Sequence, residues 1–125
     1  MPHVSEPTNL GDLLKWEEEQ LYSRDQITVA AGQNLLIGTV MGRVTATGHF
    51  KAFDPTAGDG SEQAVGILLG HIDATLIDRD DGLMLARAGI LASKLVVWPV
   101  GITATQKVAA FADLAKLGVL IRDNA

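Results

Sequence analysis

The sequence contains no cysteine, which excludes disulfide bonds and zinc sites built from thiolates. It has no apolar run long enough to cross a bilayer. Its first eleven residues, MPHVSEPTNLG, lack the basic and apolar regions of a signal peptide. Basic residues are scattered, and the formal charge of -5 argues against a protein that follows nucleic-acid phosphates. We therefore expect a cytoplasmic site of synthesis, no membrane contact and no direct nucleic-acid contact.

What the chain does contain is a large apolar fraction for its size. Its 125 residues predict one domain, which can bury a core without disulfides or metals. Hydrophobic residues make up 47% of the sequence and charged residues only 20%. A small monomer would have difficulty hiding so much apolar surface, so we expect part of it to lie in a subunit interface.

The first 25 residues differ in pattern from the rest and are predicted to form an amino-terminal arm. The opening residues are polar, with prolines and glycine, and predict a flexible segment. Residues 12–25 fit either a helix or, through the alternation of Leu14 and Trp16, a strand. We favour an extended arm with one helical turn, followed by a compact domain at 26–125.

From residue 26 onward, short apolar runs separated by Gly, Pro and Asp predict a mainly β domain. The loop at 55–61 and the turn at 78–82 carry the strongest turn signals. The predicted strands cover residues 27–29, 35–40, 43–47, 49–53, 64–69, 83–88 and 95–98, and the pattern is compatible with a last strand at 119–121.

One helix is predicted, at residues 104–117. Thr103 and Gln106 have the spacing of a capping box, in which each side chain binds an otherwise unpaired backbone N–H. Gly118 suits the left-handed position after the last turn. The predicted apolar stripe consists of Val108, Phe111, Ala112 and Ala115.

No group of residues has the pattern of a catalytic or metal site. Asp54, Asp59 and Glu62 surround one loop, but they lack the alternating register and terminal glutamate of a calcium loop, so we interpret them as turn residues. The histidines are dispersed, and no serine lies in a nucleophile elbow. We predict no catalytic residue, metal or cofactor. The alternative enzyme would assemble Asp54, Asp59 and His71 across a subunit interface.

The two tryptophans lie in different surroundings. Trp98 ends an apolar run at Pro99 and is expected to anchor a core or an interface. Trp16 lies in a charged segment with little to bury it, which is typical of a partner-binding anchor. The alternative is that Trp16 docks on its own domain.

Several short motifs, taken in order, resemble the head decoration proteins of lambda-like tailed phages. They are Lys51, Phe53-Asp54, Asp59-Gly60, Ala64-Val65-Gly66-Ile67-Leu68, Gly89, Val97-Trp98-Pro99 and Phe111-Ala112. A second group, Tyr22-Ser23-Arg24-Asp25, Ile27-Thr28-Val29 and Ala31-Gly32-Gln33, resembles the branch common in prophages and myophages. The resemblance covers about residues 13–121, and the arm departs from the Ser/Thr-rich arm of the lambda protein.

The resemblance implies a non-catalytic structural protein with a small β-clip-like domain, one or two short helices and an extended arm. It also implies homotrimers on the outer surface of the expanded capsid, at three-fold and quasi-three-fold positions. There the arms would contact the major capsid protein and stabilise the shell against packaged DNA. Synthesis would take place in the host cytoplasm. The alternative is a binding module of another virion part, such as the tail or baseplate.

Two sets of side chains are predicted to make these contacts. For the capsid-binding arm they are Leu10, Leu13, Leu14, Trp16 and Tyr22. For the trimer interface or the core they are Val65, Ile67, Leu68, Val97, Trp98 and Pro99.

Overall fold

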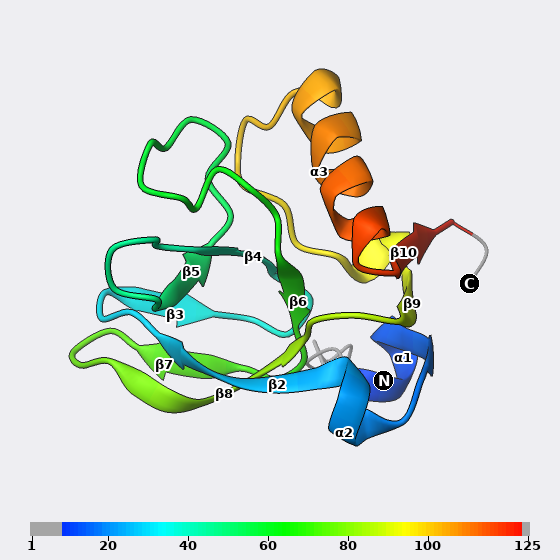
Figure 1. Ribbon diagram of the computed structural model, residues 1–125, viewed down its shortest axis with the longest axis horizontal. Coiled ribbons are helices and arrows are strands. Elements are labelled where there is room, and N and C mark those ends of the chain that lie inside the picture. Colours follow the sequence, from blue (N-terminus) through cyan, green and yellow to red (C-terminus); the bar gives the residue numbers. More distant parts are fainter. Residues whose placement is uncertain (1–8, 124–125) are drawn as a thin grey trace, which may run out of the picture.

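A computed structural model describes residues 9–123 and shows a mainly β protein with short helices, as the sequence predicted (Figure 1). The elements in chain order are α1 (Leu10–Leu13), β1 (Leu14–Glu17), α2 (Gln20–Ser23), β2 (Arg24–Val29), β3 (Gln33–Leu35), β4 (Val40–Arg43), β5 (Phe50–Ala52), β6 (Gly66–Leu68), β7 (Ile72–Ala74), β8 (Arg79–Leu85), β9 (Gly89–Ala92), a 3₁₀ turn η1 (Ser93–Leu95), α3 (Ala104–Lys116) and β10 (Val119–Arg122).

Five strands close into a small barrel in the order β2-β5-β4-β6-β8. Its longest ladder is antiparallel, between β2 and β8, and runs from the Arg24–Leu85 pair to the Val29–Arg79 pair. A two-stranded sheet of β3 and β7 stands beside the barrel. The barrel core is the apolar cluster between these strands. It consists of Ile27, Val29, Leu35, Met41, Leu68, Ile72, Ala74, Met84 and Ala86.

A second apolar cluster, the helix-side core, lies between the barrel, α3 and a three-stranded sheet ordered β1-β9-β10. In Figure 1, α3 rises from the neighbourhood of β10 on one side of the barrel. The buried members of this core are Leu13, Val40, Phe53, Ala64, Ile67, Leu69, Leu85, Leu91, Val96, Ala110, Leu114 and Val119. The molecule therefore has two cores separated by barrel strands.

The predicted helix is confirmed at both ends, but its predicted buried face is wrong. Thr103 and Gln106 form the expected capping box, and Gly118 has a positive φ of 78°. The residues of α3 that are fully buried are Ala110 and Leu114, four positions apart. The small Ala110 lets the helix approach closely, and Leu114 enters the helix-side core. The predicted stripe of Val108, Phe111, Ala112 and Ala115 instead faces outward, with Val108 66% and Phe111 37% exposed.

Several predicted strand boundaries are also wrong, because local pattern does not show where the chain must turn. The strand predicted at 35–40 is split, since Gly38 has a φ of 95° and a Cβ there would lie 2.4 Å from the Leu95 carbonyl oxygen. The turn predicted at 78–82 mostly lies within β8. The strand predicted at 95–98 is η1 followed by a single bridge between Thr39 and Val97.

The described part of the predicted arm is folded onto the body. β1 pairs antiparallel with β9, and the boundary placed at residue 25 falls inside β2. Leu13 is completely buried in the helix-side core, so it is a core residue and not a free arm residue. Residues 1–8, where the flexible segment was predicted, lie outside the described residues.

Trp98 links loop, barrel and helix, which makes its contribution to stability testable. Its ring meets Phe53 edge-on at 6.4 Å and Phe111 at 5.5 Å between centroids. We expect Trp98→Ala to lower the free energy of unfolding by about 2–4 kcal/mol, somewhat less than for a fully buried aromatic. Urea denaturation measures this, with Val108→Ala on the exposed face of α3 as the control. Equal losses for the two variants would contradict the packing role of Trp98.

Candidate functional site

The first candidate surface, here called the amino-terminal surface, consists of Trp16, Leu21 and Tyr22 on β1 and α2. These side chains are 50%, 92% and 57% exposed, which is unusual for large apolar residues on two consecutive elements. A shallow concavity of about 320 Å³ lies beside Trp16, lined mainly by residues of α1 and β1. The two elements thus present bulky apolar groups that no part of the described chain covers.

A partly buried ion pair holds these elements in place. The guanidinium of Arg24 donates from Nε to both carboxylate oxygens of Glu17, at 3.0 and 3.1 Å. The buried hydroxyl of Ser23 donates to the same carboxylate at 2.7 Å. The hydrogen bond from Arg24 is the largest cause of a lowered pKa of Glu17. The ion pair joins the two ends of the segment between β1 and β2. It therefore fixes the position of α2, which lies within that segment.

Tyr22 is positioned by Arg87, which lies two residues after the end of β8. The Arg87 guanidinium lies 5.6 Å from the centre of the Tyr22 ring and donates to the Tyr22 carbonyl oxygen. It also donates to Asp25 at 2.8 Å, and this bond raises the pKa of Arg87. Tyr22 is therefore exposed but held, which lowers the entropy that it would lose on binding a partner.

A second candidate surface is an apolar pocket of about 190 Å³, here called the Trp98 pocket. None of the described residues that line it is charged. They are Asn34, Leu35, Leu36, Thr39, Val40, Ala52, Phe53, Val97, Trp98 and Pro99. Leu36 and Val97 are exposed at its edge, and Val100 follows in the next turn. A patch with an uncharged centre is typical of a subunit interface.

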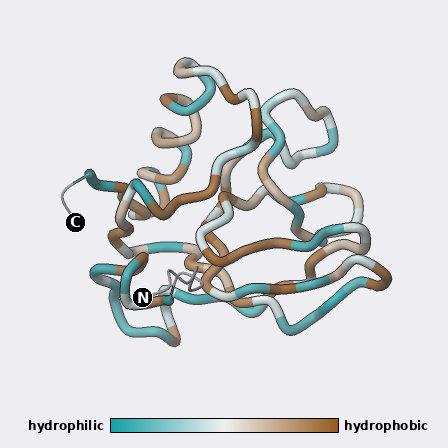
Figure 2. Tube along the Cα trace, turned by 180° about the vertical axis from the view of Figure 1, so that it is seen from behind, coloured by the Kyte–Doolittle hydropathy of each residue, from teal (hydrophilic) through white to brown (hydrophobic). Residues whose placement is uncertain are grey.

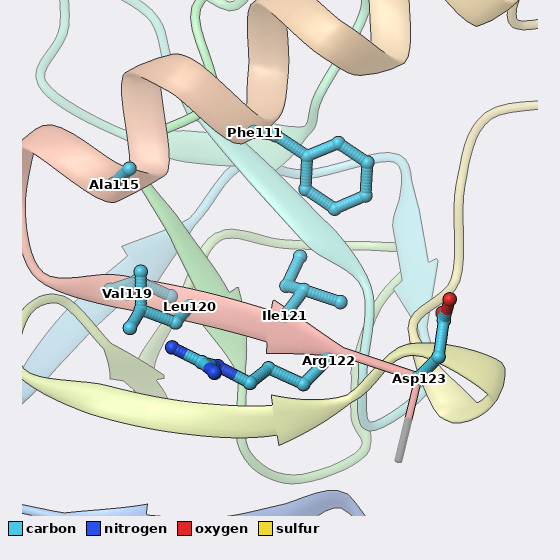
Figure 3. Close-up of a pocket in the computed structure, with 7 residues that line it drawn as sticks. All are labelled: Phe111, Ala115, Val119, Leu120, Ile121, Arg122 and Asp123. Carbon is cyan, nitrogen blue, oxygen red and sulfur yellow. The ribbon is translucent and has the colours of Figure 1, made fainter. Parts of the chain in front are cut away.

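A third hollow, of about 680 Å³, runs between α3 and the free edge of β10 (Figure 3). Figure 3 shows the Phe111 ring below the helix and Ile121 rising toward it from β10. Sequence reasoning missed this groove because it assigned the Phe111 face of α3 to the core. The available signal was the presence of a second apolar face, containing Ala110 and Leu114, on the same helix.

The β7–β8 turn carries a further apolar tip that sequence reasoning also missed. Leu76 and Ile77 are exposed there, between aspartates on both strands. In Figure 2 this tip is a brown segment at the end of a mostly hydrophilic hairpin. Figure 1 places it at the opposite end of the molecule from α1 and α2.

The structure separates the predicted contact residues into three groups. Leu13, Ile67 and Leu68 are completely buried. Leu10, Leu14 and Val65 are partly buried against the two cores. The exposed or pocket-lining residues are Trp16, Tyr22, Val97, Trp98 and Pro99.

The carboxylates around the 54–61 loop all accept hydrogen bonds from residues of that loop. Asp54 accepts from the backbone of Thr56 at 3.0 Å, and Glu62 accepts from the backbone of Gly60 at 2.8 Å. Asp59 accepts two bonds from Ser61, which lower its pKa to about 2. These bonds are those of a structured turn. Within residues 9–123, no three His, Asp or Glu side chains are grouped so as to hold a metal ion.

The described helices are all too short or too polar to span a membrane. The fold and its surfaces thus define a small β protein whose conspicuous features are apolar contact patches. Residues 3–119 match the family model described as bacteriophage lambda head decoration protein D. The chain belongs to this family, whose members are structural, non-catalytic proteins that decorate the virion capsid. A search of curated proteins found no matching relative.

The Glu17–Arg24 pair gives a pH-dependent prediction. Because the folded state lowers the pKa of Glu17, the ionised carboxylate stabilises the fold above its ordinary value of 4.5, and this stabilisation is lost as pH falls through the lowered value. We expect Glu17→Gln to lower the free energy of unfolding by about 1–3 kcal/mol at pH 7. The difference from the wild type should shrink as the pH falls from 4.5 through the lowered pKa.

Thermal or urea unfolding between pH 3 and 7 measures this difference. Glu19→Gln is the matched control, since Glu19 is exposed at the start of α2. A pH-independent difference between the wild type and Glu17→Gln would show that the charge of Glu17 is not what stabilises the loop.

Proposed function

We propose that this protein binds as a homotrimer to the outer surface of the expanded capsid, at three-fold and quasi-three-fold positions, and stabilises the shell against internal DNA pressure. Its partner there is the major capsid protein. The observation that carries the proposal is the family match over residues 3–119, together with an apolar surface on β1 and α2 that no described residue covers. The protein acts mechanically, is made in the host cytoplasm and needs no catalytic group.

The amino-terminal surface is the proposed capsid contact. Ordering a free arm costs about 1–2 kcal/mol per residue, which backbone hydrogen bonds alone barely offset. Residues 10–25 are already folded, so binding through them does not incur this cost. Burying each of Trp16, Leu21 and Tyr22 would contribute roughly 1.5–3 kcal/mol.

Three linked contacts reinforce one another on the shell. Once one subunit of a trimer is bound, the other two meet their sites at a high effective concentration. Weak single contacts then give tight attachment only where three capsid sites have the right spacing. This dependence on spacing explains why such a trimer would bind expanded shells in preference to unexpanded ones.

The Trp98 pocket is the proposed subunit contact. It supports a trimer because it is apolar, uncharged and bordered by the exposed Leu36 and Val97. The amino-terminal surface would then face the shell, and the Leu76–Ile77 tip, at the other end of the molecule, would point outward (Figure 1).

The second candidate is a non-catalytic binding module of the tail or baseplate, which would use the same surfaces. Pelleting with purified expanded shells, and separately with tails, distinguishes the two. An enzyme built on Asp54, Asp59 and His71 has less support, since both aspartates are engaged in hydrogen bonds within their own turn.

We expect the double variant Trp16→Ala/Leu21→Ala to lose shell binding while its melting temperature changes little. Each truncation removes apolar area that is exposed in the free subunit, and a loss of about 1.4 kcal/mol weakens one contact tenfold. Co-sedimentation with expanded shells across a range of protein concentrations measures occupancy. Leu76→Ala, at the opposite end, is the control and should bind normally. Undiminished binding by the double variant would rule out the amino-terminal surface as the anchor.

A truncation that tests the arm must keep the residues that are packed in the folded body. Deleting residues 1–21 would remove Leu13 and β1 and unfold part of the body, so we predict loss of stability as well as of binding. Deleting residues 1–8 keeps Leu13 and β1, so we expect the β1–β9 pairing and the packing of Leu13 to be retained, which circular dichroism and the melting temperature would show. Shell binding by this shorter deletion then measures what those eight residues add to the amino-terminal surface.

A further inference from the structure

We propose that, in the trimer put forward above, the turn at Val100 of each copy inserts into the Trp98 pocket of the next copy. This contact rests on the proposed trimer, but it names the two surfaces that meet and the side chain that joins them. It makes the interface heterologous, meaning that each subunit uses two different surfaces.

Val100 is the most exposed apolar side chain of the described chain, at 105% of its reference area. It stands at a turn closed by a hydrogen bond from the Ile102 N–H to the Pro99 carbonyl oxygen, 3.3 Å. Gly101 has a φ of 82°, which fits the third position of a type II turn. Trp98 and Ile102, on either side, both pack against the helix-side core. The residues on both sides of Val100 are therefore already ordered in the free subunit.

The Trp98 pocket suits an uncharged aliphatic occupant. Its volume of 190 Å³ equals that of about six liquid water molecules, enough for the side chain of a valine. None of the described lining residues is charged, and the hydroxyl of Thr39 is engaged with the Leu36 carbonyl oxygen at 2.7 Å. Water in such a pocket is weakly held, and an apolar side chain that displaces it gains affinity.

The charge pattern of the molecule distinguishes Val100 from the exposed apolar tip of the β7–β8 hairpin. Leu76 and Ile77 lie between Asp73 and Asp78, so their insertion would bring carboxylates to an uncharged pocket. The Val100 turn, residues 98–102, carries no charge. The uncharged turn therefore suits the uncharged pocket better than the β7–β8 tip does.

The position of the two surfaces fits a small closed ring. The turn and the pocket share Trp98 and Pro99, so they lie side by side on one face of the subunit. A contact between two different surfaces closes into a trimer when it relates successive copies by a third of a turn. A contact between the β7–β8 tip and the α3–β10 groove, at opposite ends of the molecule in Figure 1, would instead extend as an open chain.

The chain lacks cysteine, which permits a direct cross-linking test. In the double variant Leu36→Cys/Val100→Cys, we expect oxidation to give covalent dimers and trimers on a non-reducing gel, since a disulfide requires Cβ atoms within about 4.5 Å. Each single variant should stay uncoupled, as should the matched pair Leu36→Cys/Val108→Cys. Cross-linking by Val100→Cys alone would mean that the three turns meet each other, and would overturn the contact.

A second measurement tests the same contact even if the two cysteines are oriented wrongly for a disulfide. Val100→Asp should weaken trimer formation at least tenfold in analytical ultracentrifugation and leave the melting of the dilute subunit unchanged. Val108→Asp, exposed on α3, is the control and should trimerise normally. A Val100→Asp protein that forms trimers as tightly as the wild type overturns the proposal.

The remaining outcomes are also decisive. Dissociation of Val100→Asp without any Leu36 cross-link would assign Val100 to another surface and overturn the pocket contact. A wild-type protein that stays monomeric at millimolar concentration would overturn both the trimer and this contact. Shell pelleting by that monomer would still support the capsid-decorating role, so the two failures are distinguishable.

Discussion

Burial of the central barrel strands on both faces is the constraint on which the rest of the structure depends. β4, β6 and β8 separate the barrel core from the helix-side core, and successive residues of each strand enter opposite cores. The residue pairs are Val40 and Met41, Ile67 and Leu68, and Met84 and Leu85. A shift of one residue in any of these strands would exchange the two sets of side chains, so both cores fix the register together.

The barrel strands that both cores share explain why a small protein can present so much apolar surface. Two compact cores are joined through the same strands, and neither contains Trp16, Leu21, Val100 or the tip of the β7–β8 hairpin. Those groups are thus free to serve partners. The ion pair of Glu17 with Arg24 adds rigidity at the amino-terminal surface, where flexibility would weaken binding.

A structural feature could be predicted from the sequence where the residues that determine it are close together in the chain. The helix caps of α3 were predictable because Thr103, Gln106 and Gly118 act within one helical turn. The buried face of α3 was not, since that helix has two apolar faces and only tertiary packing selects one. The folding of residues 10–25 was missed for a similar reason, because β1 is stabilised by β9, more than 70 positions later. The charged segment around Trp16 did indicate that this side chain is exposed, whereas Leu13 was not recognised as a core residue.

The pairing of β1 with β9 also has a mechanical consequence. β1 lies along one edge of β9 and β10 along the other. The first and last described strands are therefore both paired with β9, which lies between them. A pull directed along β1 would load its hydrogen bonds in shear, all at once, instead of opening them one after another. The Glu17–Arg24 ion pair then ties the trailing end of β1 to the barrel. Tension applied to β1 would in this way pass from the surface of the molecule through β9 and the ion pair into the barrel.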